Sequence, residues 1–136
     1  MMLLVTGGAG FIGSNFLHYL KKYTEIEEQI IIVDNLSYAS KVQYMPLDKQ
    51  FIFEWCDISN EKHVNHIFDK WKPRKVFHFA AESHVDKSIT NYRPFLETNV
   101  IGTINLLNAS LRNNIEKFHH ISTDEVYGSL EYDDIE

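Results

Sequence analysis

Three glycines at a regular spacing of three, Gly7, Gly10 and Gly13, separate a short apolar run from a segment with helical periodicity. Glycine allows a tight backbone turn, and it lets backbone N–H groups approach a bound group closely. A glycine-rich loop between a strand and a helix is typical of α/β folds, where it holds a phosphate at the helix N-terminus. The alternative is a glycine-rich turn that holds no ligand.

Apolar runs of strand length alternate with helix-period segments along the rest of the chain. This alternation indicates βαβ units and a parallel sheet. We therefore predict an α/β fold, a doubly wound parallel sheet of the Rossmann type with about five strands in the order 3-2-1-4-5. The expected strands are Leu3–Val5, Ile30–Val33, Phe51–Trp55, Val76–Phe79 and Lys117–Ile121; the expected helices cover 11–23, 64–71 and 94–113, and 37–49 is expected to be a loop with one helical turn.

The periodic apolar residues predict which side of each helix faces the sheet. The expected buried sides are Ile12, Phe16, Tyr19, Leu20 and Tyr23 in the first helix, Val64, Ile67, Phe68 and Trp71 in the second, and Phe95, Val100, Leu106, Leu107 and Leu111 in the third.

An acidic residue, Asp34, ends the second predicted strand 21 positions after Gly13. A carboxylate at this place binds the adenosine ribose hydroxyls of a dinucleotide, and its charge disfavours the 2′-phosphate of NADP. Together with the glycine loop it predicts NAD as the cofactor and residues 1–136 as a single NAD-binding domain.

Two further strand ends are expected at the same edge of the sheet, where open α/β sheets bind ligands. Asp57 ends the third strand, and it either hydrogen-bonds the adenine or caps the helix that follows. Ala80 and Ala81 end the fourth strand, and their small side chains let the backbone lie close to the cofactor.

The run from Ser122 to Gly128 places a hydroxyl, Thr123, beside two acids, Asp124 and Glu125, where the fifth strand ends. Two adjacent carboxylates can do different work when their environments separate their pKa values. One then acts as general acid and the other as general base. The alternative is structural, with Thr123 as the N-cap and the acids in the first turn of a short helix.

Composition excludes several classes of partner. The net charge of −6 argues against nucleic acid, because phosphate contacts require clustered Lys and Arg. Cys56 is the one cysteine of the sequence, which excludes an internal disulfide, and we expect a buried structural thiol. His63 and His66 lack a carboxylate or cysteine pattern around them, so we interpret them as a solvated pair and expect no metal site. No apolar run approaches the roughly 18 residues that span a membrane, and no secretory signal begins the chain, so we expect a cytoplasmic protein without membrane contact.

Four runs resemble a known family, the extended short-chain dehydrogenase/reductases. The runs at 6–13, 80–86, 98–103 and 122–128 are similar to that family in order and spacing. The Thr-Asp-Glu run narrows the resemblance to the NAD-dependent nucleotide-sugar 4,6-dehydratases, which are lyases. The sequence leaves open whether the nucleotide is dTDP or UDP.

The resemblance implies a reaction on a nucleotide-activated glucose. The sugar is oxidised at C4, water is eliminated across C5 and C6, and the hydride returns to C6. Glu125 would remove the C5 proton, Asp124 would protonate the departing C6 hydroxyl, and Thr123 would hydrogen-bond the C4 oxygen. The residues assigned to the cofactor are Gly7, Gly10, Phe11, Ile12, Gly13, Asp34, Asn35, Asp57, Ile58, Ala80, Ala81, Ser83 and Thr98, and those assigned to the substrate are Ser83, His84 and Thr123.

One family feature is missing from these 136 residues. Family members use a Tyr-x-x-x-Lys pair to take the C4 hydroxyl proton, but here Tyr127 is followed four positions later by Glu131, and Tyr132 by Glu136. The family's C-terminal substrate-binding region is absent as well. We therefore expect the isolated chain to be catalytically incomplete; the alternative is an NAD-binding module without turnover. The family pairs as homodimers, and an uncovered helix face and sheet edge predict self-association here.

Overall fold

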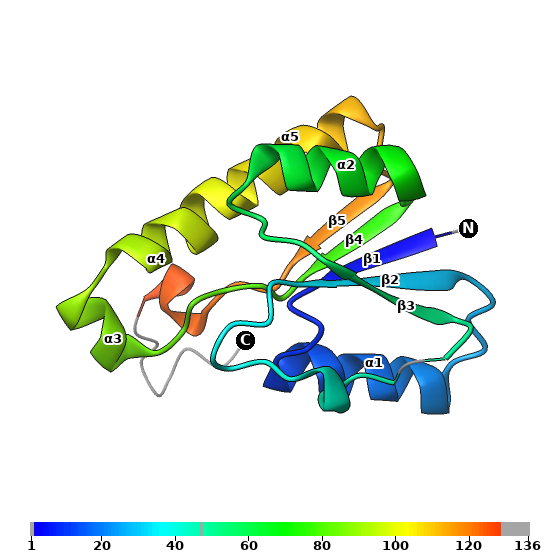
Figure 1. Cartoon of the computed structure of the whole chain (residues 1–136), viewed down its shortest axis with the longest axis horizontal. Helices are drawn as coiled ribbons and strands as arrows, with labels where there is room; N and C mark the ends of the chain where they lie inside the picture. The colour runs from blue at the N-terminus through cyan, green and yellow to red at the C-terminus, as the bar shows by residue number, and fades with distance from the viewer. Residues whose placement is uncertain (1, 47, 129–136) are drawn as a thin grey trace.

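The sheet has five parallel strands in the order β3-β2-β1-β4-β5 (Figure 1). The computed structural model describes residues 2–46 and 48–128. The α/β class and the strand order therefore agree with the prediction, with strand ends shifted by one residue or less. The strands are β1 Met2–Thr6, β2 Gln29–Asp34, β3 Phe51–Trp55, β4 Lys75–His78 and β5 Lys117–His120.

Helices cover both faces of the sheet, as a doubly wound fold requires. Figure 1 shows α1 on one side and α2 with α5 on the other. The short helix η1, Val42–Tyr44, lies in the predicted loop after β2. The helices are α1 Phe11–Tyr23, α2 Glu61–Trp71, α3 Val85–Thr90, α4 Arg93–Phe95, the π-helix η2 Leu96–Gly102, α5 Thr103–Arg112 and the 3-10 helix η3 Asp124–Tyr127.

The core has two halves, one on each side of the central strands. Alternate residues of a strand point to opposite faces, so β1 and β2 contribute side chains to both halves of the core. The run Ile30–Val33 is buried on both faces, which is what its unbroken apolar sequence predicts. One half packs against α1 through Leu3, Val5, Leu17, Leu20, Ile30 and Ile32; the other packs against α2 and α5 through Leu4, Ile31, Val64, Ile67, Phe68 and Leu106.

The predicted buried side of α1 is right for Leu20 and Phe16 but wrong for its three other residues. Ile12, Tyr19 and Tyr23 are 62%, 56% and 63% exposed. Besides Leu20, the buried residues of α1 are Gly13, Ser14 and Leu17. The helix leaves the glycine loop so close to the sheet that small side chains occupy its first turn, and the large aromatic residues are left outside.

The predicted apolar side of the third helix is also wrong, although its extent is right. Val100, Leu107 and Leu111 are 47%, 42% and 78% exposed, while Leu106 is buried. Gly102 faces the core, and a Cβ there would lie 2.6 Å from the Ile58 side chain. Close approach therefore selects small residues for the inner side: Gly102, Asn105, Ala109 and Ser110 join Leu106 there.

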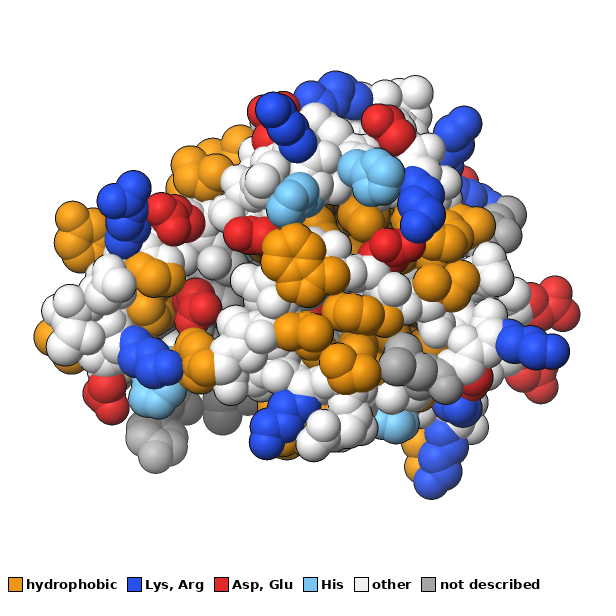
Figure 2. Space-filling view, in the orientation of Figure 1, with side chains coloured by type: hydrophobic (Ala, Val, Ile, Leu, Met, Phe, Trp, Pro, Cys, Tyr) orange, Lys and Arg blue, Asp and Glu red, His pale blue; other side chains and the backbone are white. Residues whose placement is uncertain are grey.

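Strands β3 and β5 form the two edges of the sheet in the described part of the chain. Figure 2 shows hydrophobic side chains gathered over the middle of the face that β3 crosses. Uncovered edges with apolar surroundings favour pairing with another chain. No helix within residues 2–46 and 48–128 has both the length and the apolar content needed to cross a membrane.

Candidate functional site

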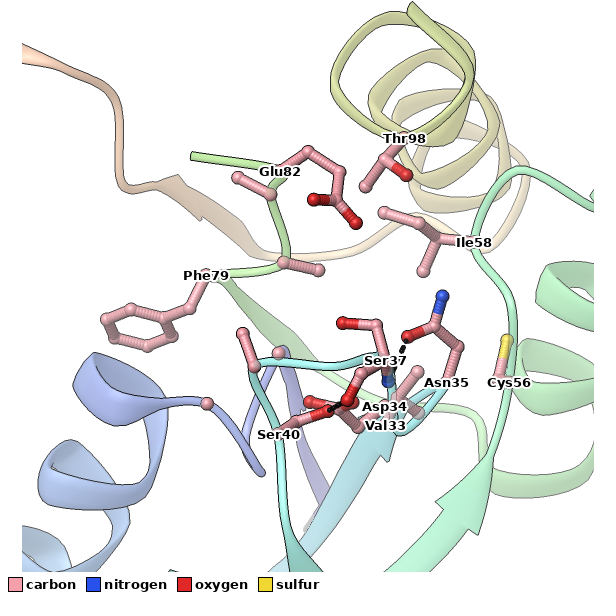
Figure 3. Close-up of a pocket in the computed structure, with 15 residues that line it drawn as sticks. Val33, Asp34, Asn35, Ser37, Ser40, Cys56, Ile58, Phe79, Glu82 and Thr98 are labelled. Atoms are coloured by element: carbon pink, nitrogen blue, oxygen red, sulfur yellow. Dashed lines mark hydrogen bonds between the residues drawn. The ribbon is translucent and has the colours of Figure 1, made fainter. Parts of the chain in front are cut away.

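A cavity lies at the carboxyl ends of the strands, where ligands of open α/β sheets bind. It is a partly open cleft, and its empty space, counted together with adjoining solvent, is about 540 Å³. Figure 3 shows Asp34 and Asn35 entering it from the end of β2, with Glu82 and Thr98 on the opposite side. Its wall is formed by Gly7, Gly10, Val33, Asp34, Asn35, Ser37, Ala39, Ser40, Cys56, Ile58, Phe79, Ala80, Ala81, Glu82 and Thr98.

The glycine loop has a backbone path that only glycine fits at two positions. Gly7 has φ of +69°, and a Cβ there would lie 2.6 Å from the Ala80 nitrogen. A Cβ at Gly13 would lie 2.2 Å from the Gly7 carbonyl oxygen, so Gly13 allows α1 to pack on the loop. At Gly10, by contrast, a Cβ would meet just the Gly7 oxygen, at 3.3 Å. The missing side chain of Gly10 therefore leaves space on the cavity side, as close approach of a pyrophosphate requires.

Asp34 holds the two loops that border the cavity. Its Oδ2 accepts a hydrogen bond from the Ala9 N–H at 3.0 Å, and its Oδ1 accepts from the Leu36 N–H at 2.8 Å. The side chain is 7% exposed. Each carboxylate oxygen has a further lone pair, so Asp34 can also accept from a ribose hydroxyl at the cavity surface.

Asp57 does not cap the following helix, which removes one of its two predicted roles. Its Oδ1 accepts from the backbone N–H and the hydroxyl of Ser59, at 2.9 and 2.8 Å. The N-cap of α2 is Asn60, whose Oδ1 accepts from the N–H groups of Lys62 and His63. Asp57 also lies outside the cavity wall, whereas its neighbours Cys56 and Ile58 are part of it.

Cys56 is an apolar element of the cavity wall. Burial, with smaller contributions from Asp57 and Glu54, raises the pKa of its thiol to about 12. The thiol therefore stays protonated and unreactive, which agrees with the predicted structural role.

The acidic residue Glu82 was not predicted as a site residue. Its carboxylate accepts a hydrogen bond from the Tyr38 hydroxyl at 3.2 Å. The side-chain amide of Asn99 holds its backbone on both sides, accepting from the Glu82 N–H at 2.8 Å and donating to the Glu82 carbonyl at 2.9 Å. A helix side chain that reaches back to a loop 17 residues earlier leaves no local signal in the sequence. The other wall residues that the sequence analysis missed are Val33, Ser37, Ala39, Ser40, Cys56 and Phe79.

Several predicted contacts lie outside the cavity wall. Phe11 and Ile12 are 81% and 62% exposed on the first turn of α1. Ser83 and His84 are exposed just beyond Glu82. Those that the structure brings together in the wall are Gly7, Gly10, Asp34, Asn35, Ile58, Ala80, Ala81 and Thr98.

The acid run after β5 begins a short helix. Thr123 and Asp124 are exposed, and the side chain of Glu125 lies outside the described part of the structure. Helix η3 starts at Asp124, and the Val126 N–H donates to the Thr123 carbonyl over 3.4 Å. The backbone of this run thus forms the short helix of the structural alternative. The side chains of Thr123 and Asp124 are nevertheless accessible to a substrate.

Metal-binding groups do not cluster in the described residues: no three His, Cys, Asp or Glu side chains there are arranged to hold an ion. His63 packs edge-on against the exposed Trp55, with ring centroids 5.4 Å apart.

Sequence comparison matches residues 4–136 to the family model described as GDP-mannose 4,6 dehydratase. The dTDP-glucose 4,6-dehydratase of Salmonella typhimurium is 40% identical over 98% of this chain and 40% of its own length. That of Streptomyces antibioticus is 45% identical over 97% of this chain and, again, 40% of its own length. The chain therefore spans about two fifths of these curated relatives.

A solved structure of similar fold is the dTDP-glucose 4,6-dehydratase of Streptomyces venezuelae, determined with NAD bound. It superposes with a TM-score of 0.87 at 39% identity, and the match covers 96% of this chain and 42% of that one. The UDP-glucose 4-epimerase of Thermotoga maritima, determined with UDP-glucose, gives a TM-score of 0.79 at 37% identity, over 90% of this chain and 38% of that one. Dehydratases and epimerases thus share this architecture.

Proposed function

The chain belongs to the GDP-mannose 4,6-dehydratase family, and on that premise we propose that it is the NAD-binding part of a dTDP-glucose 4,6-dehydratase. The observation that carries the proposal is the cavity at the carboxyl ends of the strands, where Gly7, Gly10 and Asp34 meet. Residues 1–136 form one domain for the cofactor in this proposal, and the sugar nucleotide is bound mostly by other parts of the enzyme.

The residues of the cavity fit NAD. The open space beside Gly10 suits a pyrophosphate at the start of α1, and Asp34 suits the adenosine ribose. Ile58 and Cys56 supply apolar surface for the adenine, while Ala80 and its neighbours supply the opposite wall. When bound, NAD would supply the hydride acceptor and donor for oxidation at C4 and reduction at C6.

The acid run supplies the proton transfers in this proposal. Glu125 acts as the base at C5, Asp124 as the acid at the C6 hydroxyl, and Thr123 as hydrogen-bond donor to the C4 oxygen. Ser83 and His84 would contact the sugar in this proposal, and their exposure on the loop after β4 is compatible with that role. Residue types support these roles, because a hydroxyl can orient, a protonated carboxyl can donate and a carboxylate can accept.

The choice of dTDP-glucose rests on the relatives. Those matched over nearly the whole chain at 40–45% identity are named dTDP-glucose 4,6-dehydratases. The epimerase of Thermotoga maritima is a structural neighbour as well, but inversion at C4 requires no base at C5. The pair Asp124 and Glu125 therefore favours elimination of water over epimerisation.

We propose that the 136 residues alone bind NAD without turnover, because they contain no Tyr-x-x-x-Lys pair. We also propose that the enzyme self-associates through the outer side of η2 and α5. That side exposes apolar residues in a row, namely Leu96, Val100, Ile101, Ile104, Leu107 and Leu111.

A chimera tests the proposed function directly. This chain replaces the matched segment of the Salmonella typhimurium dehydratase, so that the relative supplies the remaining part of the enzyme. The chimera is incubated with dTDP-glucose and NAD, and the sugar nucleotide is analysed by mass spectrometry. Loss of one water is the expected result, with UDP-glucose as the comparison substrate.

A folded, NAD-binding chimera that leaves dTDP-glucose intact would contradict the dehydratase assignment and leave an NAD-binding module. Conversion to a C4 epimer of unchanged mass, detected by chromatography, would instead identify an epimerase.

A further inference from the structure

A buried histidine, His78, ends β4 just before the loop that lines the cavity. Its side chain is 1% exposed, and both ring nitrogens face a threonine hydroxyl. Nδ1 lies 2.7 Å from Thr6 Oγ1, at the end of β1, and Nε2 lies 3.0 Å from Thr103 Oγ1, at the start of α5. The imidazole therefore joins the sheet to the helix that covers it.

The direction of each hydrogen bond follows from its partners. The Thr103 hydroxyl donates to the Asn99 carbonyl at 2.7 Å, and a carbonyl can only accept. The single proton of that hydroxyl is thereby used, so Thr103 Oγ1 can only accept from His78. Nε2 of His78 must then carry a proton.

The other side of the ring completes one consistent arrangement. With the proton on Nε2, Nδ1 of a neutral imidazole is an acceptor, so the Thr6 hydroxyl donates to it. Thr6 Oγ1 in turn accepts from the Ala80 N–H at 3.3 Å. A single chain of donors thus runs from Ala80 through Thr6, His78 and Thr103 to Asn99.

Two other protonation states would break this chain. A proton on Nδ1 in place of Nε2 would leave Nε2 facing Thr103 Oγ1 without a hydrogen between them. A second proton would turn Nδ1 into a donor that faces the donor hydroxyl of Thr6. Burial, with a smaller electrostatic contribution from His120, lowers the pKa of His78 to about 4, so the His78 ring is neutral near pH 7.

The chain of hydrogen bonds starts at a residue of the cavity wall, Ala80, and ends at Asn99, which binds a second wall residue, Glu82. Asn99 belongs to the π-helix η2, and its side chain holds both backbone groups of Glu82. Ala80 and Glu82 are two residues apart, and both line the cavity. Short π-helical turns occur often at functional sites, and this one aims Asn99 at the loop.

We infer that His78 is a positioning residue, which as the neutral Nε2–H tautomer ties β1 and β4 to the π-helix and thereby holds residues 80–82 in shape for the cofactor. The inference rests on the proposed function in one respect, because residues 80–82 contact NAD only if NAD is the ligand.

The tautomer can be measured by long-range ¹H–¹⁵N NMR of the histidine side chains in the 136-residue protein. At neutral pH, His78 is expected to show a protonated Nε2 and an unprotonated Nδ1. Thr103→Val removes the acceptor of the Nε2–H, and the two tautomers should then mix. Thr24→Val is the matched control, since its hydroxyl also donates to a carbonyl four residues earlier, that of Leu20 at 2.5 Å, away from the cavity. A protonated Nδ1 in the unaltered protein, or an unchanged spectrum in Thr103→Val, would overturn the inference.

Cofactor affinity separates positioning from simple stabilisation. His78→Asn keeps an acceptor near Nδ1 and loses the donor at Nε2, whereas His78→Gln keeps the donor and loses the acceptor. Each variant, and Thr103→Val, should weaken NAD binding by about 3- to 10-fold in calorimetric titration, as expected for the loss of one hydrogen bond. His66→Asn, on the exposed side of α2, should bind NAD as the unaltered protein does.

Two outcomes of the titration carry separate meanings. Variants that unfold more easily yet bind NAD with unaltered affinity would overturn the positioning role of His78. Failure of the unaltered protein to bind NAD would overturn the proposed function instead, and the tautomer spectrum would still test the hydrogen-bond chain.

Discussion

The loop after β1 and the segment after β5 both follow the carboxyl ends of parallel strands, but the contacts within the described residues hold them very differently. In the first, the Gly7 N–H donates to the Val33 carbonyl at 2.8 Å, and Asp34 binds the Ala9 N–H. In the second, Thr123 and Asp124 are exposed. The proposed cofactor side is thus held by hydrogen bonds among the described residues, whereas Thr123 and Asp124 on the acid side are exposed to solvent.

This difference indicates how the two sites acquire their properties. A dinucleotide site needs backbone groups at fixed places, and a sheet with its first crossover helix supplies them. An acid–base pair needs separated pKa values, which require burial or neighbouring charges. Under the proposed function, the substrate and the rest of the enzyme would supply the environment of Asp124 and Glu125.

The largest expected effect concerns the acid pair in the chimera with the Salmonella typhimurium dehydratase. Glu125→Gln and Asp124→Asn should each lower turnover of dTDP-glucose by about 10²–10⁴-fold, because each removes one proton transfer. NAD affinity should stay within about twofold in both variants, because the proposed function assigns both acids to the sugar and neither to the cofactor. Steady-state kinetics and calorimetry measure the two quantities.

The controls for the acid pair are Asp69→Asn and Glu27→Gln, two exposed acids elsewhere on the surface. They should leave turnover unchanged. Loss of NAD binding in Glu125→Gln would contradict the separation of the two regions.

The next largest effect concerns the packing of α1 on the glycine loop. Gly13→Ala places a Cβ 2.2 Å from the Gly7 carbonyl oxygen, which is backbone and cannot move aside easily. The free energy of unfolding should fall by about 3 kcal/mol in urea denaturation. Gly102→Ala is the comparison, because its Cβ would meet the side chain of Ile58, which can rotate about its χ angles, whereas a backbone carbonyl cannot. An equal loss in both variants would show that the loop backbone is not the rigid element.

The cofactor side was largely predictable because local backbone chemistry determines it. The spacing of Gly7, Gly10 and Gly13 and the position of Asp34 at a strand end follow from the turn and the sheet. The wall residue Glu82 was missed because its place depends on Asn99, which contacts it from another element. No spacing rule in the sequence reports such a contact.

The helix faces were mispredicted because close packing, and not hydrophobicity, selected the inner residues. Gly13 in α1 packs against the backbone of Gly7, and Gly102 in η2 packs against the side chain of Ile58, so a Cβ at either position would clash. The π-helical turn was also unpredictable, since Asn99 within it bonds Glu82, and Thr103 directly after it bonds His78, both far away in the sequence.

Acid pH should destabilise the folded protein through the buried His78, which is hydrogen-bonded to Thr6 and Thr103. The pKa of His78 is lowered to about 4 in the folded protein, against the ordinary 6.5. Above pH 6.5, His78 is neutral in both the folded and the unfolded chain. As the pH falls toward 4, His78 becomes protonated in the unfolded chain but stays neutral in the folded one. His78 should therefore lower stability by up to about 3 kcal/mol across this window. Urea titrations at several pH values should show the loss in the unaltered protein and a smaller slope in His78→Asn.

A smaller effect is expected at α2, which belongs neither to the proposed cofactor side nor to the acid run after β5. Asn60→Ala removes the side chain that accepts from the N–H groups of Lys62 and His63. Thermal unfolding should reveal a loss of about 1 kcal/mol in stability. NAD affinity should not change, and a change would extend the cofactor region beyond the cavity wall.

Calorimetric titration of NAD into the 136-residue protein tests the central claim, that these residues contain a complete dinucleotide site, most directly. The comparison uses Gly7→Ala and Gly128→Ala, because both glycines have positive φ, +69° and +76°, but only Gly7 is packed against Ala80. We predict one NAD site in the unaltered protein and in Gly128→Ala, and affinity lowered by more than about tenfold in Gly7→Ala. No binding by the unaltered protein, or equal affinity in all three, would contradict the account.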